Sequence, residues 1–255
     1  MATLKDKVVV LTGASRGIGA ATARMLAEDR PKLILCARTA EANAETKRAV
    51  EALGATAETH GFDLADGQAT HAMIDDVVSR HGHIDVLINN ASAFKLGSVA
   101  ELAPDDFQAV YQVSVMGAYN TIHAALPSML ERGAGTIINL TSVRAFNPSQ
   151  YWAAICSSKA ALISMTQCLH FDVKDSGIRV FAFSPGFTRT DMIEELYASD
   201  VFRSTGHRRS AAQPPERPAK VLAWLAREAP EDLAGQHVPI RYDDIGRRAG
   251  LEGTK

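Results

Sequence analysis

The chain has 255 residues, of which 46% are hydrophobic and 22% are charged, and its formal net charge is -2 at pH 7. This composition is typical of a globular protein, and the lack of a basic excess argues against nucleic acid as a partner. The first seven residues carry three charges and no signal-peptide core, and no apolar stretch reaches the roughly 18 residues that span a bilayer, so we expect a cytoplasmic protein that binds no membrane.

Short β-branched runs alternate along the chain with long amphipathic stretches. The runs expected to form strands lie at residues 7–12, 33–37, 55–60, 85–89, 135–140, 178–184 and 236–241. The stretches between them repeat apolar residues at helical spacing, as in Met73, Ile74 and Val77. Strands that are apolar on both faces and separated by helices form parallel sheets covered on both sides. The pattern therefore predicts a single doubly wound α/β domain over residues 1–255, with about seven strands flanked by helices on both faces.

The last third of the chain carries fewer signals. Residues 187–215 hold no recognisable motif and are expected to form the loop that shapes the substrate site, and the tail at 242–255 is expected to fray. Glycine, proline and charge concentrate at 205–218, which predicts a mobile loop between helices. Basic residues gather in and just before this loop, and they are Arg203, His207, Arg208, Arg209 and Arg217. We interpret them as a solvated surface, which we favour over a site for the phosphates of a coenzyme A or carrier arm.

A glycine-rich turn follows the first expected strand. In TGASRGIG, residues 12–19, the glycines Gly13, Gly17 and Gly19 open an amphipathic helix. Glycines at a strand-to-helix turn let the backbone approach a pyrophosphate, while the helix N-terminus presents unpaired amides and a partial positive charge. The turn and its context predict a dinucleotide site.

The residues after the second strand indicate which dinucleotide. Sites for an unphosphorylated ribose usually place an acidic residue there, whereas this chain has Ala37 and Arg38, and Arg16 follows Ser15 in the first turn. Two guanidinium groups without a carboxylate suit a dianionic phosphate. We therefore expect NADP(H) in preference to NAD(H). The three cysteines have no metal-like spacing, and no metal is expected.

At this point the chain resembles the short-chain dehydrogenase/reductase family over nearly its whole length. The resemblance rests on TGASRGIG at 12–19, FDLAD at 62–66, DVLINNAS at 85–92, INLTS at 138–142, Lys159, and SPGFTRTDM at 184–192. It implies a Rossmann-type domain, a nicotinamide dinucleotide, hydride transfer with a small-molecule substrate, and homodimers or homotetramers packed through the helices after strands 4 and 5.

The resemblance also implies roles for individual residues at the cofactor site. Asp63 matches the acid that receives the adenine amino group, and Asn89 and Asn90 match the turn beside the adenosine ribose. Pro185 and Gly186 begin the loop that holds the nicotinamide end. The implied cofactor residues are Gly13, Ser15, Arg16, Gly17, Ile18, Gly19, Arg38, Asp63, Leu64, Asn89, Asn90, Ala91, Lys159, Pro185, Gly186, Thr188 and Thr190.

The catalytic half departs from the family pattern. Ser142 and Lys159 match the family's serine and lysine, but Ile155 stands four residues before Lys159, where the family has a tyrosine. Ser114 stands where the family has an asparagine, and Ser92 replaces the last glycine of its NNAG motif. An isoleucine has no proton to give, and losing a positioned general acid commonly costs about 10² to 10⁴ in rate.

Several hypotheses accommodate Ile155. In the leading one the protein is an NADP(H)-dependent oxidoreductase of a small carbonyl, alcohol or conjugated alkene, with another proton donor. Ser142, or a water held by Ser142 and Ser114, is favoured over Tyr151, which on a continuous helix shares a stripe with Lys159. A conjugated alkene needs this donor least, because its enolate can take a proton from elsewhere. The alternatives are a catalytically silent NADP(H)-binding sensor or scaffold, and an inactivated Tyr-to-Ile variant of an active reductase.

Overall fold

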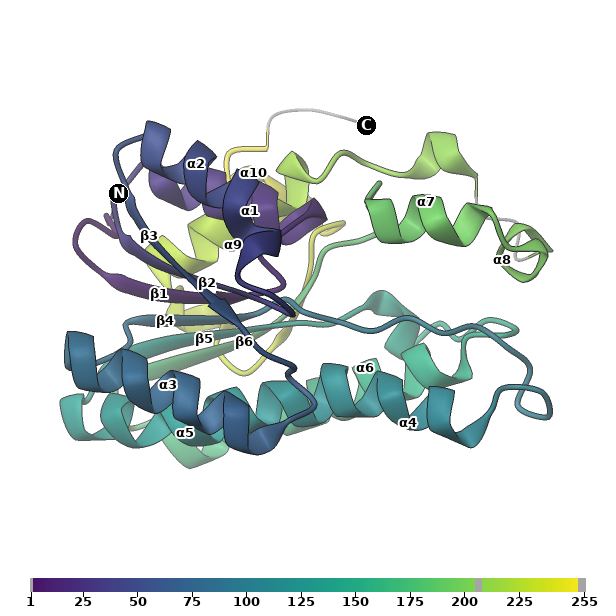
Figure 1. Ribbon diagram of the computed structural model, residues 1–255, viewed down its shortest axis with the longest axis horizontal. Helices are drawn as coiled ribbons and strands as arrows, with labels where there is room; N and C mark the ends of the chain where they lie inside the picture. The colour runs from purple at the N-terminus through teal and green to yellow at the C-terminus, as the bar shows by residue number, and fades with distance from the viewer. Residues whose placement is uncertain (1, 205–207, 252–255) are drawn as a thin grey trace.

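The computed structural model describes residues 2–204 and 208–251. Its strands form one seven-stranded parallel sheet in the order β3-β2-β1-β4-β5-β6-β7 (Figure 1). The strands are β1 (Val8–Thr12), β2 (Lys32–Ala37), β3 (Thr56–Gly61), β4 (Val86–Asn89), β5 (Gly135–Leu140), β6 (Ile178–Ser184) and β7 (His237–Pro239). The order reverses between β1 and β4, and such a reversal opens a crevice at the carboxyl ends of the two strands. The expected doubly wound α/β fold is confirmed.

Helices cover both faces of this sheet. Figure 1 shows α1, α2 and α9 on one face and α3, α5 and α6 on the other. The α-helices are α1 (Gly17–Ala27), α2 (Ala44–Ala52), α3 (Gly67–His81), α4 (Pro104–Tyr111), α5 (Gly117–Arg132), α6 (Ala153–Val173), α7 (Asp191–Tyr197), α8 (Asp200–Ser204), α9 (Glu216–Glu228) and α10 (Asp243–Arg248). Short 3₁₀ helices are η1 (Glu41–Asn43), η3 (Val143–Ala145), η4 (Arg209–Ala211) and η5 (Glu231–Leu233), and η2 (Gln112–Met116) is a π-helix.

Alternation along the strands divides the buried side chains between the two faces. In β1, Val9 and Leu11 pack into the core under α1 and α9, whereas Val8 and Val10 pack against α3 and α5. Successive residues of a strand point to opposite faces, and every residue of β1 is buried. The central strands are therefore held from both sides, and the loops at their carboxyl ends start from fixed positions.

The carboxyl-terminal third is more ordered than the sequence pattern predicts. The loop at 187–215 contains α7, α8 and η4, although His207 lies outside the described residues. The expectation of a frayed tail from 242 is wrong for α10, because Ile245 is buried in the core and the Arg248 guanidinium donates to both carboxylate oxygens of Asp232. Residues 252–255 of that tail lie outside the described residues. No helix within 2–204 and 208–251 is long and apolar enough to cross a membrane.

Candidate functional site

The turn between β1 and α1 leaves no room for a side chain at Gly13 or Gly19. Gly13 and Gly17 adopt left-handed φ angles of 64° and 56°, which glycine tolerates best. A Cβ atom built on Gly19 would overlap the carbonyl oxygen of Gly13 and lie 2.7 Å from the amide nitrogen of Asn90. The turn is consequently a backbone cradle, and α1 begins directly from it with its first N–H groups unpaired within the helix.

Asn90 joins the ends of β1 and β4 beneath this cradle. Its side-chain amide donates to the carbonyl oxygens of Thr12, at 2.8 Å, and Gly13, at 3.0 Å. The Thr12 hydroxyl accepts from the backbone N–H groups of Asn90, at 3.0 Å, and Ala91, at 3.1 Å. These four bonds fix the position of the glycine turn relative to the β4 loop.

A cavity of about 1090 Å³ begins at this turn and extends to α6 and α7. It brings together residues from both halves of the chain that sequence reasoning had assigned to the site. Except for Asn89, every residue expected to bind the cofactor lines it. Of the residues expected to be catalytic, Ser142 and Lys159 line it, while Ser114 and Tyr151 do not.

Asn89 lies below the cavity in a buried polar network. Its amide donates to the Asn139 side chain at 2.9 Å, and its carbonyl oxygen accepts from the Thr121 hydroxyl at 2.7 Å. Asn139 in turn donates to the Thr166 hydroxyl at 2.9 Å. With its donor and acceptor both engaged below the cavity, Asn89 holds β4 against β5, α5 and α6, and its side chain supports the site from below.

Charged side chains surround the nucleotide end. Arg38 is exposed at the end of β2, beside Asp63, whose carboxylate accepts from the Ala65 N–H at 2.9 Å. Arg16 donates to the Glu195 carboxylate at 2.7 Å, and both side chains are largely exposed. Glu195 belongs to α7, so this ion pair links the glycine turn to the helix on the opposite wall.

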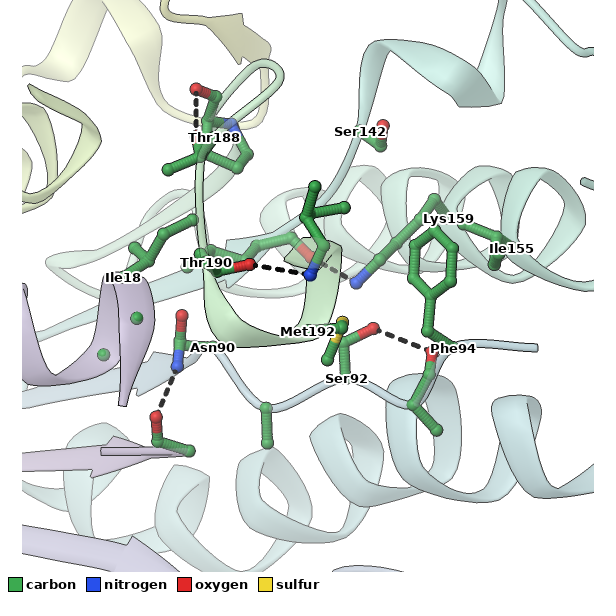
Figure 2. A pocket seen from close by; sticks show the side chains of 18 of the residues that line it. Ile18, Asn90, Ser92, Phe94, Ser142, Ile155, Lys159, Thr188, Thr190 and Met192 are labelled. Atoms are coloured by element: carbon green, nitrogen blue, oxygen red, sulfur yellow. Dashed lines mark hydrogen bonds between the residues drawn. The ribbon is translucent and has the colours of Figure 1, made fainter. Parts of the chain in front are cut away.

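Lys159 projects from α6 into the other end of the cavity. Its ammonium donates to the Leu140 carbonyl at 2.8 Å, and only 7% of the residue is exposed. Burial disfavours the charged form and lowers the pKa of Lys159 to about 8. Ser142 lies nearby at the end of β5, where its hydroxyl accepts from the Arg144 N–H at 3.1 Å and caps η3 (Figure 2).

Ile155 belongs to an apolar wall at this end. It is 4% exposed and packs with other buried apolar residues of α6, α7 and α8. Figure 2 shows Ile155 and Lys159 on the same helix. Sequence reasoning had not assigned most of this wall. The apolar residues of the wall that also line the cavity are Phe94, Trp152, Ile155, Phe187 and Ile193.

Ser114 is buried in the π-helix η2, between α4 and α5. Only 2% of it is exposed, and its hydroxyl lies 3.1 Å from the Ser92 hydroxyl and accepts from the Ala93 N–H at 3.4 Å. Ser92 lines the cavity and Ser114 does not. A water at the reacting end would therefore meet Ser92 in the place where Ser114 was expected.

Tyr151 does not share a helical stripe with Lys159, and that expectation is wrong. Helix α6 begins at Ala153, and Tyr151 adopts a left-handed φ of 70° in the preceding turn. Its carbonyl oxygen accepts from the Gly97 N–H at 3.0 Å, which ties the turn to the β4 loop. The side chain consequently leaves the path that a continuous helix would give it, and it does not line the cavity.

Comparison with known sequences matches this chain to one protein family. A family model described as short chain dehydrogenase matches residues 7–200. An uncharacterized oxidoreductase of Staphylococcus saprophyticus is 35% identical over 193 residues, which are 75% of this chain and 82% of the relative. The 3β-hydroxysteroid dehydrogenase 1 of Eggerthella lenta is 31% identical over 237 residues, 91% of each chain.

Solved structures show the same architecture. An NAD⁺-bound xylitol dehydrogenase superposes with a TM-score of 0.85 at 26% identity, covering 93% of this chain and 98% of that one. A short-chain type dehydrogenase/reductase from Mycobacterium marinum superposes with a TM-score of 0.84 at 26% identity, covering 93% and 94%.

Proposed function

The chain belongs to the short chain dehydrogenase family and is an oxidoreductase of that family, and we propose that it uses NADP(H) to transfer hydride to or from a small carbonyl, alcohol or conjugated alkene. One observation carries the proposal. A single cavity joins the backbone cradle at Gly19 to the buried ammonium of Lys159 and the apolar wall around Ile155. The nucleotide and the substrate would meet where these parts adjoin.

The nucleotide end fits a phosphorylated dinucleotide. The cradle and the N-terminus of α1 suit a pyrophosphate, since backbone can approach it closely and unpaired N–H groups face it. Arg38 and Arg16 both line the cavity, and two guanidinium groups suit a 2′-phosphate. The solved xylitol dehydrogenase is NAD⁺-bound, so the choice of NADP(H) rests on these two arginines alone.

The reacting end must supply a proton when a substrate is reduced. Bound NADPH provides the hydride, and an oxygen or enolate left on the substrate then requires a proton. Of the described residues that line the cavity, none is a tyrosine or a histidine. Lys159 has a pKa of about 8, so at neutral pH it is mostly protonated and a stronger acid than an ordinary lysine. We assign the proton to Lys159, with the Ser142 and Ser92 hydroxyls as the polar groups that orient the substrate or a water.

The apolar surroundings of Ile155 favour a second candidate, a protein that binds NADP(H) without turnover. Ile155 packs into its cluster as a core residue does, and nothing about its contacts requires a substrate. Homodimers or homotetramers and a cytoplasmic location, which the family resemblance and the sequence led us to expect, stay predictions for either candidate.

One experiment separates the candidates. Oxidation of NADPH is followed by its absorbance with a panel of ketones and enoyl thioesters, for the wild type and for Ile155→Tyr. We expect wild-type turnover of an enoyl thioester, and a gain of about 10² to 10⁴ in ketone turnover for the variant, because a phenol beside Lys159 restores the general acid. Turnover confined to the variant would establish the silent protein. Failure of NADPH to bind would refute both.

A further inference from the structure

The wall around Ile155 belongs to a third apolar cluster, separate from the two cores on the faces of the sheet. Its residues come from the start of α6, from α7 and α8, and from the loops after β4 and β6. Trp152 and Ile155 are each 4% exposed, whereas Phe94 and Phe187 line the cavity and are only partly buried. The hydride-transfer proposal assigns no part of the substrate to this wall.

The aromatic side chains of the wall hold one another in place. The rings of Phe94 and Trp152 meet edge to face, with their centroids 5.2 Å apart and their planes at 86°. The Phe202 ring, which does not line the cavity, lies 6.0 Å from Trp152 and meets Tyr197 edge to face at 4.8 Å. Aromatic pairs favour this geometry. The wall is therefore a preformed apolar surface, which lowers the entropy lost when a ligand binds.

The charges of the cavity are balanced by the proposed nucleotide. Six cations and three carboxylates are among the described residues that line it. The phosphates of NADP⁺ give that nucleotide a net negative charge equal to this excess, and NADPH is one charge more negative. The cations are Arg16, Arg38, Arg144, Lys159, Arg208 and Arg241, and the carboxylates are Asp63, Asp191 and Glu195.

Arg144, the guanidinium beside the wall, is engaged by the protein itself. Its Nη1 donates to the Ser149 hydroxyl at 2.7 Å, and its central carbon lies 5.3 Å from the centroid of the Trp152 ring. An anionic group on the substrate would consequently be buried here without a cation of its own, which is costly. The reacting end is suited to an uncharged substrate.

Ile155 brings apolar surface close to the reacting groups. It stands four residues before Lys159 on α6, so the two side chains are neighbours on one face of the helix, with Cβ atoms about 6 Å apart. A ligand that covers Ile155 therefore reaches the Lys159 ammonium within a few bonds of its apolar body. This arrangement suits a carbonyl attached directly to an apolar skeleton.

We propose that the substrate is an uncharged, ring-bearing molecule with a conjugated carbonyl, and that its ring packs against Phe94, Phe187 and Ile155 while its oxygen lies toward Lys159. The inference rests on the proposed function and narrows its substrate class. NADPH delivers hydride to the β-carbon, the electrons of the double bond form an enolate, and the Lys159 ammonium gives the enolate a proton. The products are the saturated carbonyl compound and NADP⁺, and Lys159 regains its proton from water.

The test compares three probes, titrated by calorimetry into the protein saturated with NADP⁺ and into the protein alone. Benzylacetone is the product expected from a phenyl-bearing substrate of this class, hydrocinnamate has a carboxylate in place of its methyl ketone, and butanone lacks the ring. We expect benzylacetone to bind about tenfold more tightly than hydrocinnamate, because the carboxylate would be buried without a partner. It should also bind at least about tenfold more tightly than butanone, because its ring buries apolar surface.

Phe94→Ala tests whether the wall is the surface that binds the ring. The variant should lose about tenfold in affinity for benzylacetone and keep its affinity for butanone, since the deleted side chain covers only the ring. Phe171→Ala is the matched control, because Phe171 is 70% exposed on α6 and does not line the cavity. This control should bind all three probes as the wild type does.

Three results would overturn the proposal. They are hydrocinnamate binding as tightly as benzylacetone, benzylacetone binding no better than butanone, and undiminished binding of benzylacetone by Phe94→Ala. If Phe94→Ala does not fold, Phe94→Leu replaces it and should lose a smaller part of the same affinity.

The titrations without nucleotide separate this inference from the proposed function. Failure of NADP⁺ to bind would refute the proposed function, while the order of the probes on the protein alone would still test the wall. Benzylideneacetone, the unsaturated partner of benzylacetone, should oxidise NADPH in the presence of the wild type. If benzylacetone is preferred and NADPH stays unoxidised, hydride transfer is refuted and the class of ligand stands.

Discussion

At its nucleotide end the cavity includes a backbone cradle with charged side chains around it, whereas at its reacting end it is walled by apolar side chains. The cradle at Gly19 is closed by the Gly13 carbonyl and the Asn90 amide, and nothing larger than hydrogen fits there. The wall at Ile155 consists of apolar side chains from α6, α7 and the β4 loop. A backbone surface admits almost no change of residue, while an apolar wall accepts substitutions that keep its volume. Substitutions at the reacting end can therefore change the substrate that the cavity accepts while the nucleotide end keeps its nucleotide.

Gly19→Ala, at the nucleotide end, should cause the largest loss of ligand affinity. The added methyl would overlap the Gly13 carbonyl, so the turn must move and the cradle is lost. Overpacking of this kind costs about 3 kcal/mol, and a loss of that size in binding corresponds to about a hundredfold weaker nucleotide affinity. Nucleotide titration would measure the loss of affinity, and thermal unfolding of the same variant would measure the loss of stability.

Gly246→Ala is the control for this substitution. A Cβ at Gly246 in α10 meets only the Leu251 Cβ, at 3.8 Å, which is an ordinary contact. Affinity for the nucleotide should be unchanged. If the two alanine variants bind NADP⁺ equally well, the backbone cradle at Gly19 does not form the nucleotide site.

The difference between the two ends also determines what could be predicted from sequence. The glycine turn and Arg38 could be located because each follows directly from the end of an expected strand, whereas Asn90 was located only by the family resemblance. Tyr151 was placed wrongly because the helix was expected to include it, whereas α6 begins at Ala153 and Tyr151 has a left-handed φ in the preceding turn.

Asn89 illustrates the limit within a correctly predicted motif. Its neighbour Asn90 bonds the glycine turn, whereas Asn89 points to the other side of the strand end and joins Asn139 and Thr121. Adjacent strand residues face opposite sides, so the shared cofactor role that the resemblance implied for both residues does not fit this geometry. The partners that complete the network lie 32 and 50 residues away and carry no local signal.

Arg38→Ala should weaken nucleotide binding less than Gly19→Ala does. If Arg38 binds the 2′-phosphate, its loss removes a charge-assisted contact and weakens NADPH by about tenfold to a hundredfold, with NADH unaffected. Titration of both nucleotides into the wild type and the variant gives the ratio directly. Arg48→Ala, an exposed arginine of α2 that does not line the cavity, should bind both as the wild type does. An NADPH affinity unchanged by Arg38→Ala would contradict the assignment.

At the reacting end, the pKa of Lys159 predicts the pH dependence. Reduction needs the protonated ammonium, so turnover should be constant below pH 8 and fall about tenfold for each further pH unit, given a pKa of about 8. The same shift affects stability. Between pH 8 and the ordinary lysine pKa of 10.5, the unfolded chain keeps a proton that folded Lys159 has lost, so the free energy of unfolding should rise with pH.

Lys159→Met should remove the pH dependence of turnover and that of the free energy of unfolding, so it is the reference for both measurements. Chemical unfolding of the wild type and the variant across this pH range tests the titration without any substrate. A wild-type rate that rises through pH 8 would point to a base, and the proton would then have to come from a hydroxyl or a water.

Glu195→Gln should give the smallest effect, at the point where the two ends meet. The ion pair with Arg16 crosses from α7 to the glycine turn, and both side chains are largely exposed, 66% for Glu195 and 46% for Arg16. Exposed pairs contribute little, so releasing Arg16 to a 2′-phosphate should strengthen NADPH by at most about fivefold and leave NADH unchanged. Glu194→Gln is the matched control, because Glu194 pairs with Arg209 and does not line the cavity. The gain should shrink as salt is added, since exposed charges are screened. An equal gain in affinity for NADH would contradict competition between Glu195 and the 2′-phosphate for Arg16. Glu195 would then act by restraining the position of α7, and the helix would couple the two ends of the cavity.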